Sequence, residues 1–372
     1  MAVPQAPKLG LASRALLGAS IAGDLASRTL LASVISGAMT VGVLGGAGAD
    51  DARRLEFYAA LADERDRDAV FIRPPADVRV RSTAGRPPGV EGGRTDVLRF
   101  DTPYVALNPA VRAAYAGHPH NNVARAQHWR HESGPRPTLC VIHGFGASPA
   151  WFNSAFFSLE AFFAQGWDVL LHTLPFHGSR RGQRPAFNGV EMFSHGFAQW
   201  NEAILHGVYD FRILVDYLER TGAPLFGVTG LSLGGYISAV LAAVEPRLAF
   251  VVPNAPVVSI DPLLASWYPA NLTVGLGRRV RGVSRELMRR SFAVHSPLNY
   301  VPIVPRERLM IIGGLGDRLS PPEQSVLLWE HWGHPALHWF PGNHVAHFGR
   351  RGYLAEMRAL MDDSLQEAAL VA

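Results

Sequence analysis

The chain has 372 residues, which is enough for one large domain with extensions or for two small domains. Hydrophobic residues make up 48% of it and charged residues 18%, a composition that predicts a large buried core and excludes general disorder. The net charge is only +4 and there is no long basic run, which excludes a nucleic-acid-binding arm, while the single cysteine, Cys140, excludes an intrachain disulfide.

The N-terminal segment contains an apolar run, Thr29 to Ala49, that carries no charged residue. Its last three residues, Ala47-Gly48-Ala49, are similar to a signal-peptidase site. However, the preceding stretch is long and contains Asp24, and the glycines in the run disfavour a membrane-spanning helix. We interpret the segment as a helical extension of a cytoplasmic or membrane-associated protein. Association with a membrane through the N-terminus and export both remain open alternatives.

Residues 1–92 are expected to form a helical and linker extension, and residues 93–372 the main domain. Asp51 to Arg67 has the spacing of a charged helix, and Ser82 to Gly93 is a connection rich in glycine, proline and arginine. Val97 to Leu107 and Val123 to Trp129 are strand-like and are expected to pair as an antiparallel hairpin.

From Thr138 onward, short apolar runs alternate with helical patterns. The predicted strands are Thr138–Ile142, Trp167–Thr173, Leu225–Thr229, Phe250–Val258, Leu309–Gly313 and His338–Phe340. The predicted helices are Ala155–Gln165, Phe197–Thr221, a helix that follows Gly235 and ends at about Val244, and Tyr353–Ala369. This alternation predicts an α/β fold, with a mostly parallel sheet covered by helices on both faces. Residues 261–305 interrupt the rhythm and are expected to form a small cap over the carboxyl edge of the sheet, where active sites of open α/β sheets lie.

One turn has the pattern of an activated serine. Gly230-Leu-Ser232-Leu233-Gly234 follows a predicted strand and precedes a helix. A serine at such a sharp, strained turn needs glycines two residues to either side, where side chains would clash. Ser232 is therefore the predicted nucleophile, and a simple tight turn is the alternative.

A second loop, His143-Gly-Phe145-Gly146, follows the strand Thr138–Ile142. The negative oxygen of a tetrahedral intermediate needs two hydrogen-bond donors that are already in place. The backbone N–H groups of Leu233 and Phe145 are predicted to supply them, with Gly146 as the alternative to Phe145.

A serine needs a base, and the base needs an orienting carboxylate. Asp317 follows one predicted strand and His344 the last one, so that serine, aspartate and histidine occur in the order that this type of turn predicts. Asp261 is the alternative acid and His347 the alternative base.

Several histidines crowd the C-terminal part of the chain, namely His331, His334, His338, His344 and His347. There is no H-E-x-x-H motif and no cysteine that could complete a zinc site. Neither a metal ion nor any other cofactor is expected.

Together these motifs resemble those of the α/β-hydrolase superfamily, over about Val97 to Leu365. A narrower likeness, to the alpha/beta hydrolase domain-containing protein 18 group, rests on Pro224 to Gly235 and on the loop that begins at Pro175. The resemblance implies the α/β-hydrolase fold and a serine hydrolase with a catalytic triad, a nucleophile elbow and an oxyanion hole. His177 and Asn343 depart from the narrower group's pattern, so no substrate is carried over from it.

The expected activity is that of a serine esterase or lipase-like enzyme acting on a small-molecule or lipid-like ester. Trp151 and Trp267 are expected to line an apolar acyl site. One of Arg180, Arg181 and Arg184 is a candidate to bind an anionic group of the substrate, and a solvated loop is the alternative for all three. Phe156 and Phe157 fit core packing better. An acyltransferase, a peptidase or a non-catalytic protein of the same fold remain alternatives.

Overall fold

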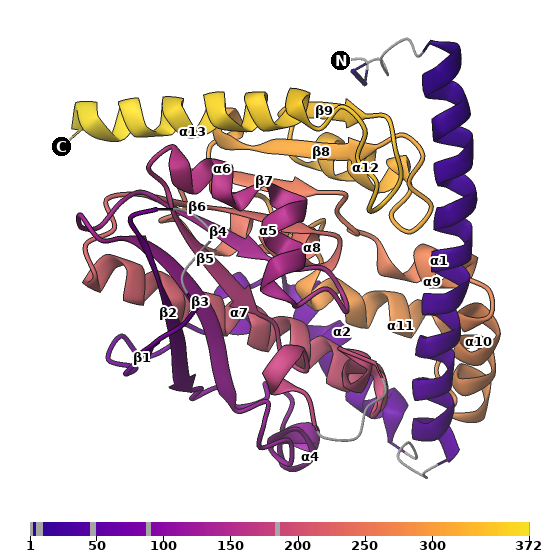
Figure 1. The fold of residues 1–372 in the computed structure, drawn as a ribbon. Coiled ribbons are helices and arrows are strands. Elements are labelled where there is room, and N and C mark those ends of the chain that lie inside the picture. Colours follow the sequence, from indigo (N-terminus) through magenta and orange to yellow (C-terminus); the bar gives the residue numbers. More distant parts are fainter. Residues whose placement is uncertain (1–2, 5–9, 45–49, 87–90, 183–186, 372) are drawn as a thin grey trace.

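The computed structural model describes residues 3–4, 10–44, 50–86, 91–182 and 187–371. Their centre is a nine-stranded sheet in the order β1-β2-β3-β5-β4-β6-β7-β8-β9 (Figure 1). The strands are β1 (Arg81–Ala84), β2 (Gly93–Asp101), β3 (Val123–His131), β4 (Thr138–Ile142), β5 (Asp168–Thr173), β6 (Phe226–Leu231), β7 (Val251–Asn254), β8 (Met310–Gly314) and β9 (Ala336–Phe340). Strands β4 to β9 pair in parallel, which confirms the predicted α/β class.

The predicted antiparallel hairpin is formed by β2 and β3, but β2 ends at Asp101 rather than at Leu107. The chain leaves the sheet because the next residues bind a helix instead. The Thr102 hydroxyl donates to Asp210 at 2.6 Å, and the Leu107 N–H donates to Glu202 at 2.9 Å. The segment predicted as a connection contains β1, which pairs antiparallel with β2. The expected boundary at residue 92 therefore falls between two paired strands.

Helices cover both faces of the sheet. The side chains of β4 alternate between two apolar clusters, with Leu139 and Val141 in one and Cys140 and Ile142 in the other. Helices α5 (Ala150–Phe157), α6 (Leu159–Ala164) and α13 (Arg351–Val371) contribute to the first cluster. Helices α7 (Gly196–Arg220), α8 (Leu233–Val244) and α12 (Pro322–His331) contribute to the second. The predicted helix Ala155–Gln165 is split into α5 and α6 at Ser158, where φ is +56°.

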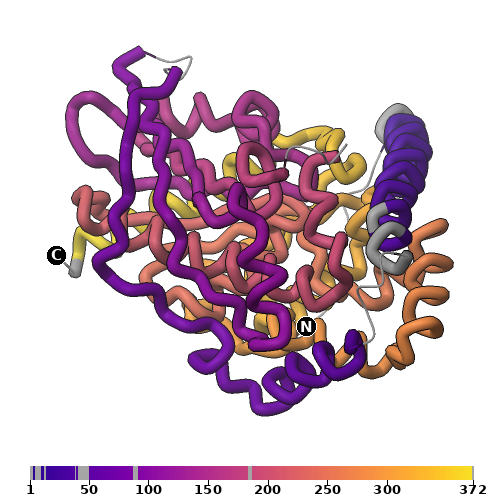
Figure 2. The backbone as a smooth tube through the Cα atoms, turned by 90° about the horizontal axis from the view of Figure 1, so that it is seen from below, coloured from indigo at the N-terminus to yellow at the C-terminus, as the bar shows by residue number. Residues whose placement is uncertain are grey.

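Three helices lie between β7 and β8, in the segment predicted as a cap. They are α9 (Ile260–Ser266), α10 (Ala270–Val280) and α11 (Arg285–Phe292). The N-terminal helices are α1 (Leu11–Leu44), α2 (Asp51–Glu64) and α3 (Arg67–Val70), and a short helix α4 (Arg112–Ala116) precedes β3. Helix α1 runs beside α10, as Figures 1 and 2 both show, while α2 packs against α11.

The N-terminal extension is joined to the main domain by a buried carboxylate on α7. Glu202 accepts hydrogen bonds from the hydroxyls of Tyr58 and Tyr104, both at 2.5 Å, and from the N–H groups of Leu107 and Asn108, both at 2.9 Å. Burial raises the pKa of Glu202, and these four donors oppose that shift. Because Tyr58 lies on α2, the extension packs as part of the domain.

No described helix, α1 included, combines the length and the apolar character needed to cross a membrane. The Ala47-Gly48-Ala49 motif lies outside the described residues.

Candidate active site

Ser232 occupies a strained turn between β6 and α8. Its φ is +56°, in the region that L-residues rarely adopt. A Cβ atom on Gly230 would lie 2.4 Å from the carbonyl carbon of Gly234, and one on Gly234 would lie 2.0 Å from the carbonyl oxygen of Ile142. Only glycine fits at both positions, for the steric reason that the G-x-S-x-G pattern implies.

Phe145 and Leu233, the predicted oxyanion donors, both line a cavity that Ser232 also lines. Neither backbone N–H donates a hydrogen bond to any residue that the structure describes. Leu233 is also the first residue of α8, where the helix dipole favours a negative charge. The two groups are thus available to an external acceptor.

The loop that carries Phe145 is held by two side chains that the sequence analysis did not single out for this purpose. The His143 ring contacts the Gly144 carbonyl through Nδ1 at 2.8 Å and accepts from the Leu174 N–H through Nε2 at 3.1 Å. Burial lowers the pKa of His143 to about 4, so the ring is neutral. The Asn188 amide donates to the Gly146 carbonyl at 3.0 Å. Asn188 lies more than forty residues away in sequence, and no local pattern marks it.

Asp317 and His344, the predicted acid and base, are in direct contact. The Nδ1 atom of His344 lies 2.6 Å from Oδ2 of Asp317, and the other carboxylate oxygen accepts from the N–H groups of Leu319 and Ser320. Burial lowers the pKa of His344, but the negative charge and the hydrogen bond of Asp317 outweigh it, so the pKa lies above its ordinary value. Ser232, Asp317 and His344 follow β6, β8 and β9, and therefore lie at the same edge of the sheet.

The two alternative residues have other partners. Asp261 lies on α9 and pairs with Arg285 of the cap at 3.2 Å. His347 contacts the Tyr353 hydroxyl at 3.0 Å and stacks on Phe340, and burial lowers its pKa to about 3. Neither Asp261 nor His347 therefore makes the carboxylate–imidazole contact that Asp317 and His344 share in the described structure.

The cavity beside Ser232 has a volume of about 80 Å³, and its walls are almost entirely apolar. Leu31 and Ile35 of α1 form one wall, and Phe145 and Trp267 lie among the others. Trp267 thus lines the same cavity as Ser232, and its buried indole N–H has no hydrogen-bond partner among the described residues. The contribution of α1 was not predicted.

Two predicted substrate-binding residues lie elsewhere. The Arg180 guanidinium is fully buried, pairs with Asp210 at 2.7 Å and donates to the backbone carbonyls of Asn121 and Thr173. Its charge is neutralised inside the protein rather than turned toward a substrate. Trp151 is 74% exposed on α5 and does not line the Ser232 cavity. Arg184, an alternative to Arg180, lies outside the described residues.

Phe156 and Phe157 belong to a buried apolar cluster, in keeping with the core role expected for them. In the described part of the chain, no three side chains of His, Cys, Asp or Glu are grouped so that they could hold a metal ion. His331 instead contacts the Tyr300 carbonyl, and His338 contacts Glu356.

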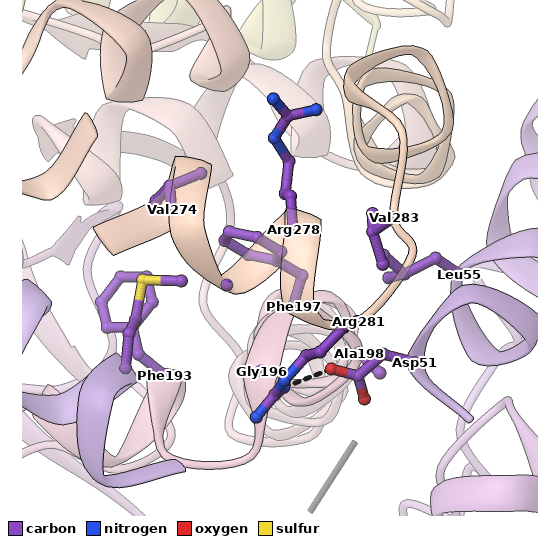
Figure 3. A pocket seen from close by; sticks show the side chains of 12 residues that line it. Asp51, Leu55, Phe193, Gly196, Phe197, Ala198, Val274, Arg278, Arg281 and Val283 are labelled. Atoms are coloured by element: carbon purple, nitrogen blue, oxygen red, sulfur yellow. Dashed lines mark hydrogen bonds and ion pairs between the residues drawn. The ribbon is translucent and has the colours of Figure 1, made fainter. Parts of the chain in front are cut away.

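A smaller cavity of about 30 Å³ lies next to the Ser232 cavity and shares the side chains of Phe193 and Phe197 with it (Figure 3). Asp51 of α2 and Arg281, which follows α10, both line this cavity and form an ion pair. A space of this size holds about one water molecule. The pair ties α2 to the cap.

The mostly parallel sheet, with helices on both faces, has the α/β-hydrolase fold. Acetyl xylan esterase 1 from Thermoanaerobacterium sp. JW/SL YS485 superposes with a TM-score of 0.58 at 19% identity, over 81% of this chain and 93% of that protein. Acetyl xylan esterase from Paenibacillus sp. R4 gives a TM-score of 0.56 at 14% identity, over 84% of this chain and 94% of that protein. At such identities the likeness establishes the fold alone. The narrower likeness to the alpha/beta hydrolase domain-containing protein 18 group finds no support in these similarities.

Two Mycobacterium tuberculosis proteins are similar in sequence, the uncharacterized protein MT2702 of strain CDC 1551 / Oshkosh and the uncharacterized protein Rv2627c of strain ATCC 25618 / H37Rv. Each is 30% identical over 328 residues, which cover 83% of this chain and 73% of the relative. The chain belongs to the same family as these two proteins. No established family profile matches it.

Proposed function

We propose that the protein is a carboxylic-ester hydrolase that works through Ser232, His344 and Asp317. One observation carries the proposal. The buried 2.6 Å contact between His344 and Asp317 lies at the same sheet edge as the strained turn of Ser232. A serine hydroxyl on such a turn, at the same sheet edge as an imidazole oriented by a carboxylate, supports acyl transfer through that serine.

The steps follow from the roles of these groups. The Ser232 Oγ attacks the ester carbonyl carbon as its proton passes to Nε2 of His344, and Asp317 holds Nδ1–H and stabilises the imidazolium. The oxyanion accepts hydrogen bonds from the N–H groups of Phe145 and Leu233. His344 then protonates the departing alkoxide, which leaves an acyl-enzyme. Water attacks that acyl-enzyme with His344 again as base, and the carboxylic acid and free serine are released.

The cavity volume supports a short apolar acyl group. A cavity of about 150 Å³ is filled by one benzene molecule. The space beside Ser232 is about 80 Å³, so only a few carbon atoms fit without movement of the walls. Acyl chains of about two to four carbon atoms are therefore the expected substrates.

Helix α1 should set the upper limit of acyl length. Leu31→Ala removes wall atoms from the cavity, so kcat/KM for a hexanoyl ester relative to an acetyl ester should rise about tenfold. The measurement is a series of p-nitrophenyl esters of increasing chain length. Leu30→Ala is the matched control, because Leu30 is 67% exposed on the same helix and should leave the ratio unchanged. An equal change in both variants would contradict the assignment of Leu31 to the acyl wall.

The first test of the proposal is covalent labelling by a fluorophosphonate probe. Wild-type protein should gain one adduct on Ser232, located by peptide mass spectrometry, and Ser232→Ala should gain none. If both folded proteins remained unlabelled, the hydrolase proposal would fail and a non-catalytic role would replace it. Product analysis with added alcohols or amines then distinguishes hydrolysis from transfer to another acceptor, and a panel of blocked peptides tests peptidase activity.

A further inference from the structure

Helix α1 brings a buried carboxylate to the two loops that carry the proposed acid and base. Asp24 is only 2% exposed although it lies on a long helix at the edge of the molecule. Its Oδ2 atom accepts from the backbone N–H of Arg318 at 2.8 Å and from that of His344 at 3.1 Å. Arg318 directly follows Asp317, so one oxygen atom bridges both loops of the site.

Neighbouring turns of α1 fix this helix in the same place. The Asn343 amide donates to the Ser20 carbonyl at 2.8 Å, one turn before Asp24. Leu17 packs so closely on Gly316 that a Cβ atom there would lie 2.6 Å from its Cδ1 atom. The residues just before Asp317 and just before His344 are therefore both in contact with α1.

Burial of a carboxylate on a helix face costs free energy, because removal of a charge from water is unfavourable unless the charge is compensated. The titratable groups that face Asp24 are Asp317, from the loop after β8, and His344, from the loop after β9. His347, on the same loop as His344, is held neutral by burial. Asp24 thus faces one acid and one base. Two backbone N–H groups stabilise its charge, and the His344 ring adds to that stabilisation when it is positive.

On the basis of the proposed function, we infer that Asp24 is a positioning residue of the active site. It locks the loops of Asp317 and His344 in their catalytic arrangement, and it adds a second negative charge that stabilises the imidazolium formed during acyl transfer. It touches neither the substrate nor the reacting atoms, and it acts through the backbone of His344 and through the field at its ring. The N-terminal extension is then part of the catalytic apparatus.

Two substitutions separate these effects. Asp24→Ala removes both the acceptor and the charge and leaves two N–H groups unpaired, so kcat for a short p-nitrophenyl ester should fall on the order of 30-fold with KM nearly unchanged. Asp24→Asn keeps an acceptor oxygen, so kcat at the pH optimum should fall less than about tenfold.

The pH profile gives the readout that a merely structural role would not change. Asp24 raises the pKa of His344, so Asp24→Asn should lower that pKa and move the acidic limb of kcat/KM to lower pH. Asp363→Asn on α13 is the control. It removes an exposed carboxylate that does not belong to the proposed site, so the acidic limb of kcat/KM should stay at the same pH. An unchanged limb in Asp24→Asn, with folding and thermal midpoint intact, would overturn the inference.

A second measurement keeps the test independent of activity. The His344 ring can be titrated by ¹⁵N NMR in wild type and in Asp24→Asn, with His344→Gln to assign the signal. A lower pKa in the variant supports the inference even if no ester is cleaved, and equal pKa values overturn it. Absence of both labelling and turnover in wild type would instead count against the proposed function.

Discussion

Replacement of His344 by alanine should lower kcat for ester hydrolysis by about a millionfold. Without the imidazole no group in contact with Asp317 can accept the Ser232 proton, and the remaining rate comes from substrate binding and the oxyanion donors. Initial rates with a short p-nitrophenyl ester, measured on protein free of wild-type contamination, give the value. Asp317→Asn should lower kcat less, by about 10⁴-fold, because the imidazole remains but is no longer held in the productive tautomer.

His347→Gln is the matched control for His344→Ala. His347 is three residues further on, and its Nδ1 contacts Tyr353 rather than a carboxylate. Its loss should change kcat by no more than about tenfold, since glutamine can still hydrogen-bond to the hydroxyl. If His347→Gln abolished activity and His344→Ala did not, the base would be His347 and the mechanism above would be wrong.

The Gly234→Ala substitution should be strongly destabilising, because Gly234 has the shortest added-Cβ contact among the described glycines. Its Cβ atom would lie 2.0 Å from the Ile142 carbonyl oxygen and 2.7 Å from the carbonyl carbon, both backbone atoms of the central strand β4. Because neither can move without disturbing the sheet, the free energy of unfolding should fall by about 3 kcal/mol or more. Urea denaturation followed by circular dichroism measures the change.

Gly37→Ala provides the control for that experiment. Gly37 lies within α1 and has no atom within 4 Å of its added Cβ position. Alanine there should raise the free energy of unfolding by about 0.5–1 kcal/mol, through the lower entropy of the unfolded chain. If the two alanine variants were equally stable, the close approach of the Ser232 turn to β4 would be disproved.

Local sequence patterns were sufficient for the parts of the molecule whose constraints are local. The strand Thr138–Ile142 was predicted with its bounds because its apolar run ends where a glycine loop begins. The Ser232 turn was predicted because the need for glycine at positions 230 and 234 is visible in the local sequence pattern. The parallel pairing of β4 to β9 was predicted from the alternation of strands and helices, since parallel strands require crossovers.

The site residues that were missed or misplaced depend on distant partners. Asp24 contacts the backbone of His344, which lies 320 positions away in the sequence, and no sequence pattern around residue 24 predicts that contact. Arg180 follows β5 as expected, but Asp210 on α7 draws its guanidinium into the interior. Trp151 and Trp267 look equivalent in sequence, and only the packing of their helices separates a surface position from a cavity wall.

The docking of α1 makes the proposed active site sensitive to proteolysis. After a single cut between α1 and α2, only packing and hydrogen bonds would hold Asp24, Leu31 and Ile35 to the rest of the molecule, although none of the three proposed triad residues would be lost. Removal of residues 1–49 would take away the same three side chains. We expect loss of α1 to lower the activity at least as much as Asp24→Ala does, while Ser232 itself stays in place.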